Sequence, residues 1–392
     1  MHDASALNAT FRNSLPEPEK LMSEIRALQS SDIPALAGMF QRVFRDPRAP
    51  ASKSLADYLQ HFYLDAPGQS IGIESLVHLN DGGEMTGFVG ATGLPMTFEG
   101  RQLRAAICGS LMVEGREADP LAGARLLKAF LAGPQDLSFS ETASEVSASM
   151  WMKLRGVALP QYSLDWLRII RPAGFFVELG RSRIGAARFL RPLARKTDDV
   201  LCRRMGADEL RWSGIPSSWN GQGSFKTIEV SAEAFAELFV RLTARFKLRP
   251  DFPDDQLAYI LQDAKQARAE GEAVFCKVEA RTGAVVGAFV YHGDAGRIGR
   301  VLQILAIPGQ ERQVINCLIA HAAERGVVAL RGRTQPALLE AMLGRRIAFT
   351  HIASSVIHAK DPDILQAFQN GDGFFNGLAG EHWSRLAAGD IG

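Results

Sequence analysis

The sequence has few cysteines and no long apolar run, and each absence excludes a class of protein. The four cysteines, Cys108, Cys202, Cys276 and Cys317, lie far apart, so neither a disulfide framework nor a metal-ligand spacing can be built from them. No apolar run approaches the roughly 20 residues that span a bilayer. The N-terminal residues include acids and prolines where a signal peptide has an apolar core. We therefore expect a cytoplasmic protein without a metal site or a transmembrane segment.

The sequence also lacks a dominant charge. Its 44 lysines and arginines nearly balance its 43 aspartates and glutamates, which gives a net charge of +1. We therefore expect no general attraction to DNA or to an acidic membrane. The composition, 46% apolar and 22% charged, is that of an ordinary globular protein. Because 392 residues exceed what one hydrophobic core usually serves, two domains are expected.

The strongest local pattern lies in residues 105–133. The apolar stretch 107–113 predicts a strand buried on both faces, and the loop 114–120 leads into a helix. Four apolar residues recur on one face of that helix: Leu126, Leu127, Phe130 and Leu131. Since the first N–H groups of a helix have no internal acceptor, this strand, loop and helix predict an anion site.

The patterns around this unit predict one order of elements twice. Residues 23–172 are expected to form a strand, two helices, three strands, a helix, a strand, a helix and a closing strand at 162–170. Residues 225–392 repeat this order, with an apolar strand at 301–307 and a last strand at 349–358. The tail 372–383 is expected either to add a strand or to cover an edge. The repeated order predicts a tandem pair of domains.

Two segments fall outside the repeat. Residues 1–22 are expected to be a loose N-terminal arm, and residues 173–224 a basic linker helix followed by a flexible connection. The stretch 181–204 is rich in arginine and has two interpretations. It packs as a helix across the two domains with its arginines in solvent, or it lies on an anionic membrane.

This order of elements resembles the GCN5-related N-acetyltransferase (GNAT) superfamily. The resemblance implies an α+β fold with α/β/α layers and two tandem GNAT-like domains, each a mixed, mostly antiparallel sheet flanked by helices. It also implies an N-acetyltransferase activity, in which acetyl-CoA or another acyl-CoA gives its acyl group to an amine of a small molecule or peptide. No metal is implied.

The resemblance also indicates where coenzyme A would bind. The family pattern of Arg or Gln, two residues, Gly, one residue, then Gly or Ala falls on Ala118, Leu121 and Gly123, of which only Gly123 fits. Asp119 is unfavourable beside a pyrophosphate but can cap the helix. The equivalent loop of the second half offers only Gly309 and Arg312, which predicts a cofactor-free copy. The implied cofactor-binding residues are Met112, Val113, Arg116, Leu121, Ala122, Gly123 and Ala124.

The resemblance implies catalytic groups as well. Glu114, at the end of the central strand, and Glu141, on the next strand, are the candidate general bases. At the family's usual position for the acid this chain has Met152, so Tyr162 becomes the candidate. A solvated loop glutamate, a turn partner and a core tyrosine are the alternative interpretations of Glu114, Glu141 and Tyr162.

Two other functions remain open. An aminoacyl-tRNA-dependent transferase with the same paired fold would explain the incomplete loops, with the arginines of 181–204 contacting phosphate. A catalytically idle ligand-binding or scaffold protein would explain the missing glycines and the missing tyrosine. The sequence leaves the acceptor and a homodimer undecided.

Overall fold

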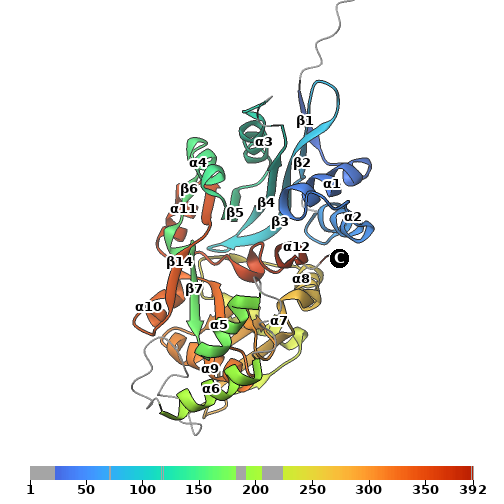
Figure 1. Cartoon of the computed structure of the whole chain (residues 1–392). Helices are drawn as coiled ribbons and strands as arrows, with labels where there is room; N and C mark the ends of the chain where they lie inside the picture. The colour runs from blue at the N-terminus through green and yellow to red at the C-terminus, as the bar shows by residue number, and fades with distance from the viewer. Residues whose placement is uncertain are drawn as a thin grey trace, which may run out of the picture.

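The computed structural model describes residues 23–69, 72–115, 117, 119–181, 191–204, 224–389 and 391. The loose arm expected for residues 1–22 lies outside them. The strands of the described residues form two mixed sheets, each flanked by helices, which lie one beyond the other in Figure 1. The expected α+β fold with two tandem GNAT-like domains is therefore confirmed.

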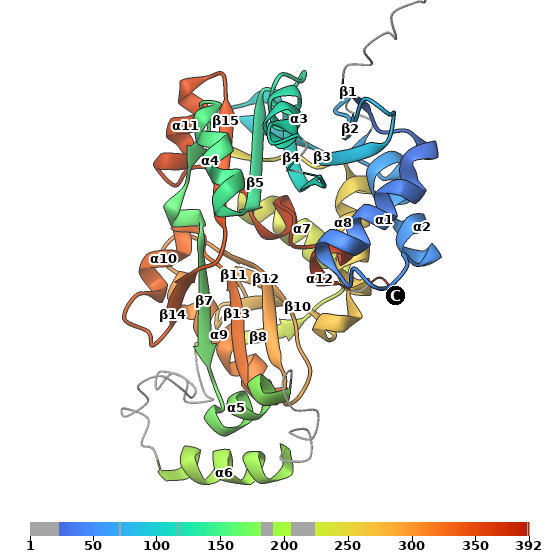
Figure 2. The same cartoon turned by 45° about the horizontal axis from the view of Figure 1, so that its top comes forward.

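The first sheet has the strand order β1-β2-β3-β4-β5-β15-β6, and β9 pairs with the far end of β3. Helices α3 (Ala122–Leu131) and α4 (Glu145–Lys153) pack on one face, and α1 (Ile33–Phe44) and α2 (Lys53–Gln60) pack on the other. Figure 2 shows both groups beside the sheet. The strands are β1 (Glu24–Ala27), β2 (Leu76–Leu79), β3 (Met85–Phe98), β4 (Arg101–Val113), β5 (Leu137–Ala143), β6 (Val157–Ala158), β9 (Leu248–Pro250) and β15 (Ser354–Ala359).

Local sequence explains where several of these elements begin. The Ser52 side chain accepts a hydrogen bond from the Leu55 N–H at 3.1 Å and so caps α2, and Ser144 caps α4 in the same way. The Asn80 side chain accepts the backbone N–H groups of Gly82 and Glu84, each at 2.9 Å, which fixes the turn between β2 and β3. Strands β2 and β3 therefore form a hairpin.

The second sheet has the order β14-β7-β13-β12-β11-β10-β8. Helices α9 (Glu311–Glu324) and α10 (Pro336–Met342) cover its outer face, while α7 (Ala232–Thr243) and α8 (Asp254–Gln266) lie between the two sheets (Figure 2). The strands are β7 (Leu164–Ile169), β8 (Phe225–Glu229), β10 (Ala273–Ala280), β11 (Val285–His292), β12 (Ile298–Ala306), β13 (Ala329–Arg333) and β14 (Ala348–His351).

One hydrophobic core joins the two halves. In β11, Ala288 and Val290 face this shared core, whereas Phe289 and Tyr291 face α9, as the two-residue period of a strand requires. The same core includes side chains of the first sheet and of α7 and α8. The two sheets therefore pack into a single body through their inner helices.

Strands β7, β9 and β15 each join the sheet of the other half, and two of them correct expectations. The stretch 162–170 does not close the first unit, because β7 pairs with β13 and β14 of the second sheet. The stretch 349–358 forms two strands, of which β14 joins the second sheet and β15 pairs with β5 and β6 of the first. A strand pattern reveals burial but not which sheet edge the strand joins. The limits 23–172 and 225–392 stay a proposal for dividing the chain.

The arginine-rich linker begins with α5 (Pro172–Arg181), which packs Phe175 against Val328 and Ala329. Helix α6 (Arg191–Arg204) follows, and residues 182–190 and 205–223 lie outside the described part of the chain. Within that described part, no helix combines the length and the apolar character that crossing a membrane requires.

Candidate functional site

The two central strands of the first sheet separate halfway along their length. Strands β4 and β5 pair in parallel only from Ala105 to Ile107 on β4, and among the described residues no strand pairs with that edge of β4 further on. In the same region Ser110 and Leu111 lie opposite the single residue Val89, and Ser110 has a φ of 52°. This β-bulge re-aims the backbone and side chain of Ser110 toward the split.

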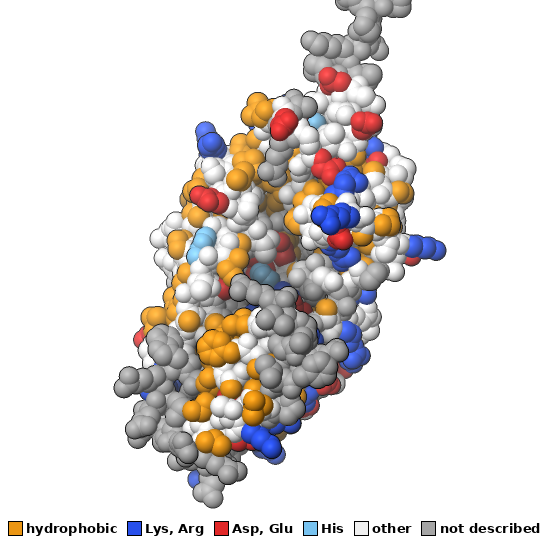
Figure 3. All heavy atoms as spheres, in the orientation of Figure 1, with side chains coloured by type: hydrophobic (Ala, Val, Ile, Leu, Met, Phe, Trp, Pro, Cys, Tyr) orange, Lys and Arg blue, Asp and Glu red, His pale blue; other side chains and the backbone are white. Residues whose placement is uncertain are grey.

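A cavity of about 460 Å³ opens at this split. It lies on the face of the sheet that carries α1 and α2, opposite α3, because Ile107 and Gly109 line it while Cys108 faces the α3 side. Figure 3 shows this face hollowed between the two halves, with acidic and histidine side chains inside. Much of the wall is aromatic: Phe40, Phe44, Phe62, Tyr63 and Trp383.

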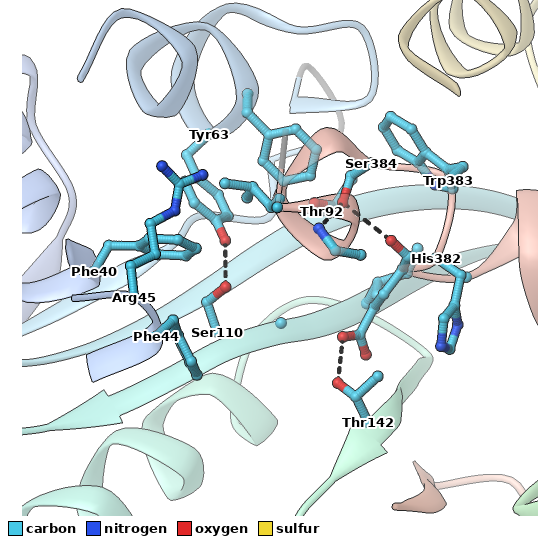
Figure 4. Close-up of a pocket in the computed structure, with 18 of the residues that line it drawn as sticks. Phe40, Phe44, Arg45, Tyr63, Thr92, Ser110, Thr142, His382, Trp383 and Ser384 are labelled. Atoms are coloured by element: carbon cyan, nitrogen blue, oxygen red, sulfur yellow. Dashed lines mark hydrogen bonds between the residues drawn. The ribbon is translucent and has the colours of Figure 1, made fainter. Parts of the chain in front are cut away.

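Glu381 brings a carboxylate to the split from the C-terminal tail. Its Oε1 accepts the Ser140 hydroxyl and the Glu141 N–H, both at 2.9 Å, and its Oε2 accepts the Thr142 hydroxyl at 2.7 Å. Burial, and then the nearby negative charge of Glu141, raise the pKa of Glu381 above its usual range. Figure 4 shows Thr142 and His382 on the same side of the cavity. A carboxylate with a raised pKa at the mouth of a cleft is suited to accept a proton.

Glu141 has the opposite electrostatic character. Its side chain is fully buried and accepts the Glu381 N–H at 2.5 Å, the Gly377 N–H at 3.2 Å and His382 Nδ1 at 3.0 Å. Burial opposes ionisation, but His382, the Glu381 N–H and Arg333 outweigh it, so the pKa of Glu141 is lowered. A Cβ at Gly380 would overlap this carboxylate. Glu141 therefore anchors the tail and is poorly suited to accept a proton.

Tyr63 lines the same cavity as Glu381. Its hydroxyl hydrogen-bonds the Ser110 hydroxyl at 3.0 Å, and Figure 4 shows the two side chains pointing toward one another. Burial raises the pKa of Tyr63 far above its usual value, so the phenol keeps its proton. A Cβ at Gly90 would meet the Tyr63 ring at 2.6 Å, so this position requires a glycine.

The expected cofactor loop lies on the opposite face of the sheet, at the start of α3. Asp119 accepts the Leu121 N–H at 3.3 Å and pairs with Arg125 and His78, so part of this helix terminus is already occupied. Among the described residues, none accepts the N–H groups of Gly123 and Ala124.

The remaining residues of this loop differ in their burial. Leu121 is 63% exposed, whereas Met112 and Ala122 are buried and Val113 is partly buried. A Cβ at Gly123 would lie 3.4 Å from Val113, so the helix packs closely on the strand end. Arg116 lies outside the described residues.

The other two predicted catalytic residues do not reach the cavity. Glu114 follows β4, but both of its carboxylate oxygens pair with Arg42 of α1, at 2.7 and 2.8 Å. Tyr162 is buried in the core and donates its hydroxyl to the Gly373 carbonyl at 2.6 Å. Neither lines the 460 Å³ cavity. Sequence reasoning missed Glu381, Tyr63 and Ser110, since their meeting depends on how a distant tail and helix pack against β4.

The second sheet has a corresponding split, and the tail fills it. Strands β12 and β13 pair in parallel from Ile298 and Ala329, and the pairing ends at Val301 and Gly332. Beyond that point the Leu378 N–H donates to the Gln303 side chain at 3.1 Å, and the Asn376 side chain donates to the Thr334 carbonyl at 2.9 Å. Among the described residues, the tail 372–383 thus forms none of the β-strands of the two sheets. It occupies one split and brings Glu381 to the other.

No metal centre is evident in this part of the molecule. Among the described residues, no three His, Cys, Asp or Glu side chains lie close enough together to hold a metal ion.

Comparisons with known proteins identify the fold. No protein-family model and no curated protein matches the sequence. Among solved structures, the chain is similar to a GCN5-related N-acetyltransferase from Kribbella flavida, at 12% identity over 87% of this chain and 71% of that one, with a TM-score of 0.51.

Two further structures are similar over comparable lengths. One is a conserved protein of unknown function from Enterococcus faecalis V583, described as a probable N-acyltransferase, at 12% identity over 88% of this chain and 74% of that one, with a TM-score of 0.54. The other is a GCN5-related N-acetyltransferase from Anabaena variabilis ATCC 29413, at 9% identity over 87% and 73%, with a TM-score of 0.53. The chain therefore has the fold of the GCN5-related N-acetyltransferases.

Proposed function

We propose that this protein is an N-acyltransferase that moves an acetyl or other acyl group from coenzyme A to an amine of a small molecule or peptide. The observation that supports this most strongly is the position of Glu381, whose raised-pKa carboxylate lies where the β4–β5 split meets an open cavity. The fold neighbours include N-acetyltransferases. On the sequence features described above, we place the activity in the cytoplasm.

The acyl-CoA would lie along the split, on the α3 side. The unpaired edge of β4 would offer backbone groups to an extended pantetheine arm, and the N–H groups of Gly123 and Ala124 would bind its pyrophosphate. The positive end of the α3 dipole adds attraction of about 0.3–1 kcal/mol. The bound thioester supplies an activated acyl carbon, and the chain's own residues supply positioning and proton transfer.

The acceptor amine would enter the 460 Å³ cavity from the α1 and α2 side. Glu381 would accept a proton from the amine as the nitrogen forms its bond to the acyl carbon. Its hydrogen bonds to Ser140 and Thr142 fix the direction of the carboxylate. Tyr63, through Ser110, would give a proton to the departing thiolate, which yields an amide and free coenzyme A. The proton held by Glu381 would then return to Tyr63 through solvent, which restores both groups.

The second half would serve this site without binding a cofactor of its own. Its split is filled by the tail at Gly377 and Leu378, and a Cβ at Gly377 would overlap the Leu302 carbonyl. The tail continues from there to Glu381. The second domain would therefore hold the segment that carries the general base.

The test is thiol release from acetyl-CoA with a panel of amines, comparing the wild-type protein with Glu381→Gln. The glutamine preserves the shape and most hydrogen bonds of Glu381 but cannot accept the proton, so kcat should fall about 10²–10⁴-fold. Glu114→Gln is the matched control, because that carboxylate lies outside the cavity. Equal rates for wild type and Glu381→Gln would refute the proposed base.

The pH profile adds a second readout. With an acceptor of low pKa, such as an aniline or a hydrazide, the amine is already neutral and only the enzyme titrates. Since activity requires ionised Glu381, kcat/KM should rise with pH through a pKa above the usual glutamate value of about 4.3. Glu381→Gln should lose this acidic limb.

A further inference from the structure

A second cavity, of about 320 Å³, adjoins the first. The two cavities share Arg300, His382 and Ala387 in their linings, so they lie side by side. The second cavity is walled by the inner face of the second sheet, with Arg331 and Arg333 on β13 and Asp165 on β7. A molecule whose reacting end lies at Glu381 can therefore extend toward this sheet.

Two arginines of the second cavity lie on neighbouring strands. Arg300 of β12 and Arg331 of β13 are direct cross-strand partners. Like charges in that position repel one another. One carboxylate serves both, because Glu270 lies 3.7 Å from Arg300 Nη1 and 3.3 Å from Arg331 Nη2. Two guanidinium groups thus share a single counter-charge.

The other arginine and the other carboxylate that line this cavity neutralise one another. Arg333 pairs with Asp165 at 3.1 Å and donates its remaining N–H groups to the chain, including the carbonyls of Glu141 and Ala353. Among the side chains that line the second cavity there are thus three arginines and two carboxylates, and the Glu141 carboxylate, which does not line it, also favours the charge of Arg300. Arg300 is almost fully buried, whereas the Arg331 side chain is 56% exposed and accessible to a ligand.

We propose that the acceptor carries an anionic group, a carboxylate or a phosphate, which Arg331 and Arg300 bind while its amine reaches Glu381. The guanidinium fork of arginine suits both anions through paired hydrogen bonds. This inference rests on the proposed function, since it assigns a role to the amine at Glu381. It narrows the substrate class to amines that carry an acidic group, with the distance between the two groups set by the separation of Glu381 from Arg331 and Arg300.

The test measures KM for matched acceptors with acetyl-CoA. Peptides of one to four residues that begin with phenylalanine are compared as C-terminal carboxylates and as C-terminal amides, because the first cavity has an aromatic wall. At the length that spans the two cavities, the carboxylate form should have a KM at least about tenfold lower. A second series compares amino alcohols with their phosphate monoesters, which distinguishes phosphate from carboxylate.

Two variants with opposite expected effects test the site. Arg331→Gln should raise the KM of the anionic acceptor toward that of the neutral one, whereas Glu270→Gln should lower it by removing the competing carboxylate. Arg312→Gln, on α9 at the outer face of the sheet, removes the same charge and should leave the preference intact. Equal KM values for anionic and neutral acceptors at every length, or a preference that survives Arg331→Gln, would overturn the inference.

The failure of this inference differs from the failure of the proposed function. Titration calorimetry of the same peptides, without acyl-CoA, measures anion binding directly. If acyl-CoA is turned over but carboxylate and amide peptides bind equally, the anion site is wrong and the transferase stands. If neither acyl-CoA nor any amine reacts, the proposed function fails, and a carboxylate preference lost in Arg331→Gln would still support the site.

Discussion

Glu141 and Glu381 hold one another by reciprocal hydrogen bonds. The Glu141 N–H donates to the Glu381 carboxylate at 2.9 Å, and the Glu381 N–H donates to the Glu141 carboxylate at 2.5 Å. The first residue lies on β5 and the second on the tail, 240 positions later in the chain. This pair fixes the tail at the β4–β5 split and gives its two carboxyls opposite pKa shifts.

The raised pKa of Glu381 predicts a cost in stability at neutral pH. The stability that its protonated form contributes is complete below the unfolded pKa and is lost as pH rises through the raised folded pKa. Glu381→Gln should therefore be at least as stable as wild type near pH 7, although it loses activity. Urea unfolding at pH 4 and pH 7 measures this, and a large loss of stability at pH 7 would contradict it.

Glu141→Gln should have the opposite effect. The lowered pKa of Glu141 contributes stability above its unfolded pKa, which is lost as pH falls through the folded pKa. The variant turns an amide toward the N–H groups of Gly377 and Glu381, so we expect a loss of about 3 kcal/mol near pH 7. Thermal unfolding across pH 3–7 checks this, since the difference from wild type should shrink at acid pH.

Removing the hydroxyl of Tyr63 or of Tyr162 should have different effects, because we propose proton transfer for the first and packing for the second. Tyr63→Phe removes the hydroxyl that meets Ser110 in the cavity and should lower kcat about 10–100-fold. Tyr162→Phe removes a buried hydrogen bond to the Gly373 carbonyl and should cost about 1 kcal/mol of stability with kcat unchanged. Steady-state kinetics of both variants measures the change in kcat, and denaturant unfolding measures the change in stability. A larger kcat effect at Tyr162 would restore the acid expected from the sequence.

The N-terminus of α3 can be tested by charge. Leu121 is 63% exposed at the first turn, so a substitution there disturbs little packing. Leu121→Glu should weaken acyl-CoA binding about tenfold by placing a negative charge beside the pyrophosphate, whereas Leu121→Gln should bind as wild type. Calorimetry at low salt measures both. Equal affinities would place the pyrophosphate elsewhere.

Much of the fold follows from the sequence, and the exceptions have a physical reason. The spacing of apolar residues identifies β4, α3 and their counterparts β12 and α9. A buried strand or helix face requires apolar residues at the spacing of that element. The sequence does not show that β7 joins the second sheet and β15 the first. The two-residue pattern of a buried strand fits either sheet equally well. The same limit applies to Glu381, which becomes functional only where the tail crosses Glu141 and Thr142.

The structure bears on one of the two alternatives raised by the sequence. The transferase that uses aminoacyl-tRNA stays a prediction from the arginines in 181–204, because residues 182–190 lie outside the described part of the chain. An idle scaffold has no need of a raised-pKa carboxylate at an open split, which Glu381 provides. We therefore favour the acyltransferase.

The central claim is that one acyl-CoA binds to each chain, at the β4–β5 split. Isothermal titration with acetyl-CoA and longer acyl-CoAs tests this most directly, because the second split is filled by Asn376 and Leu378. We expect a single site per chain. A stoichiometry of two, or no binding of any acyl-CoA, would contradict the account.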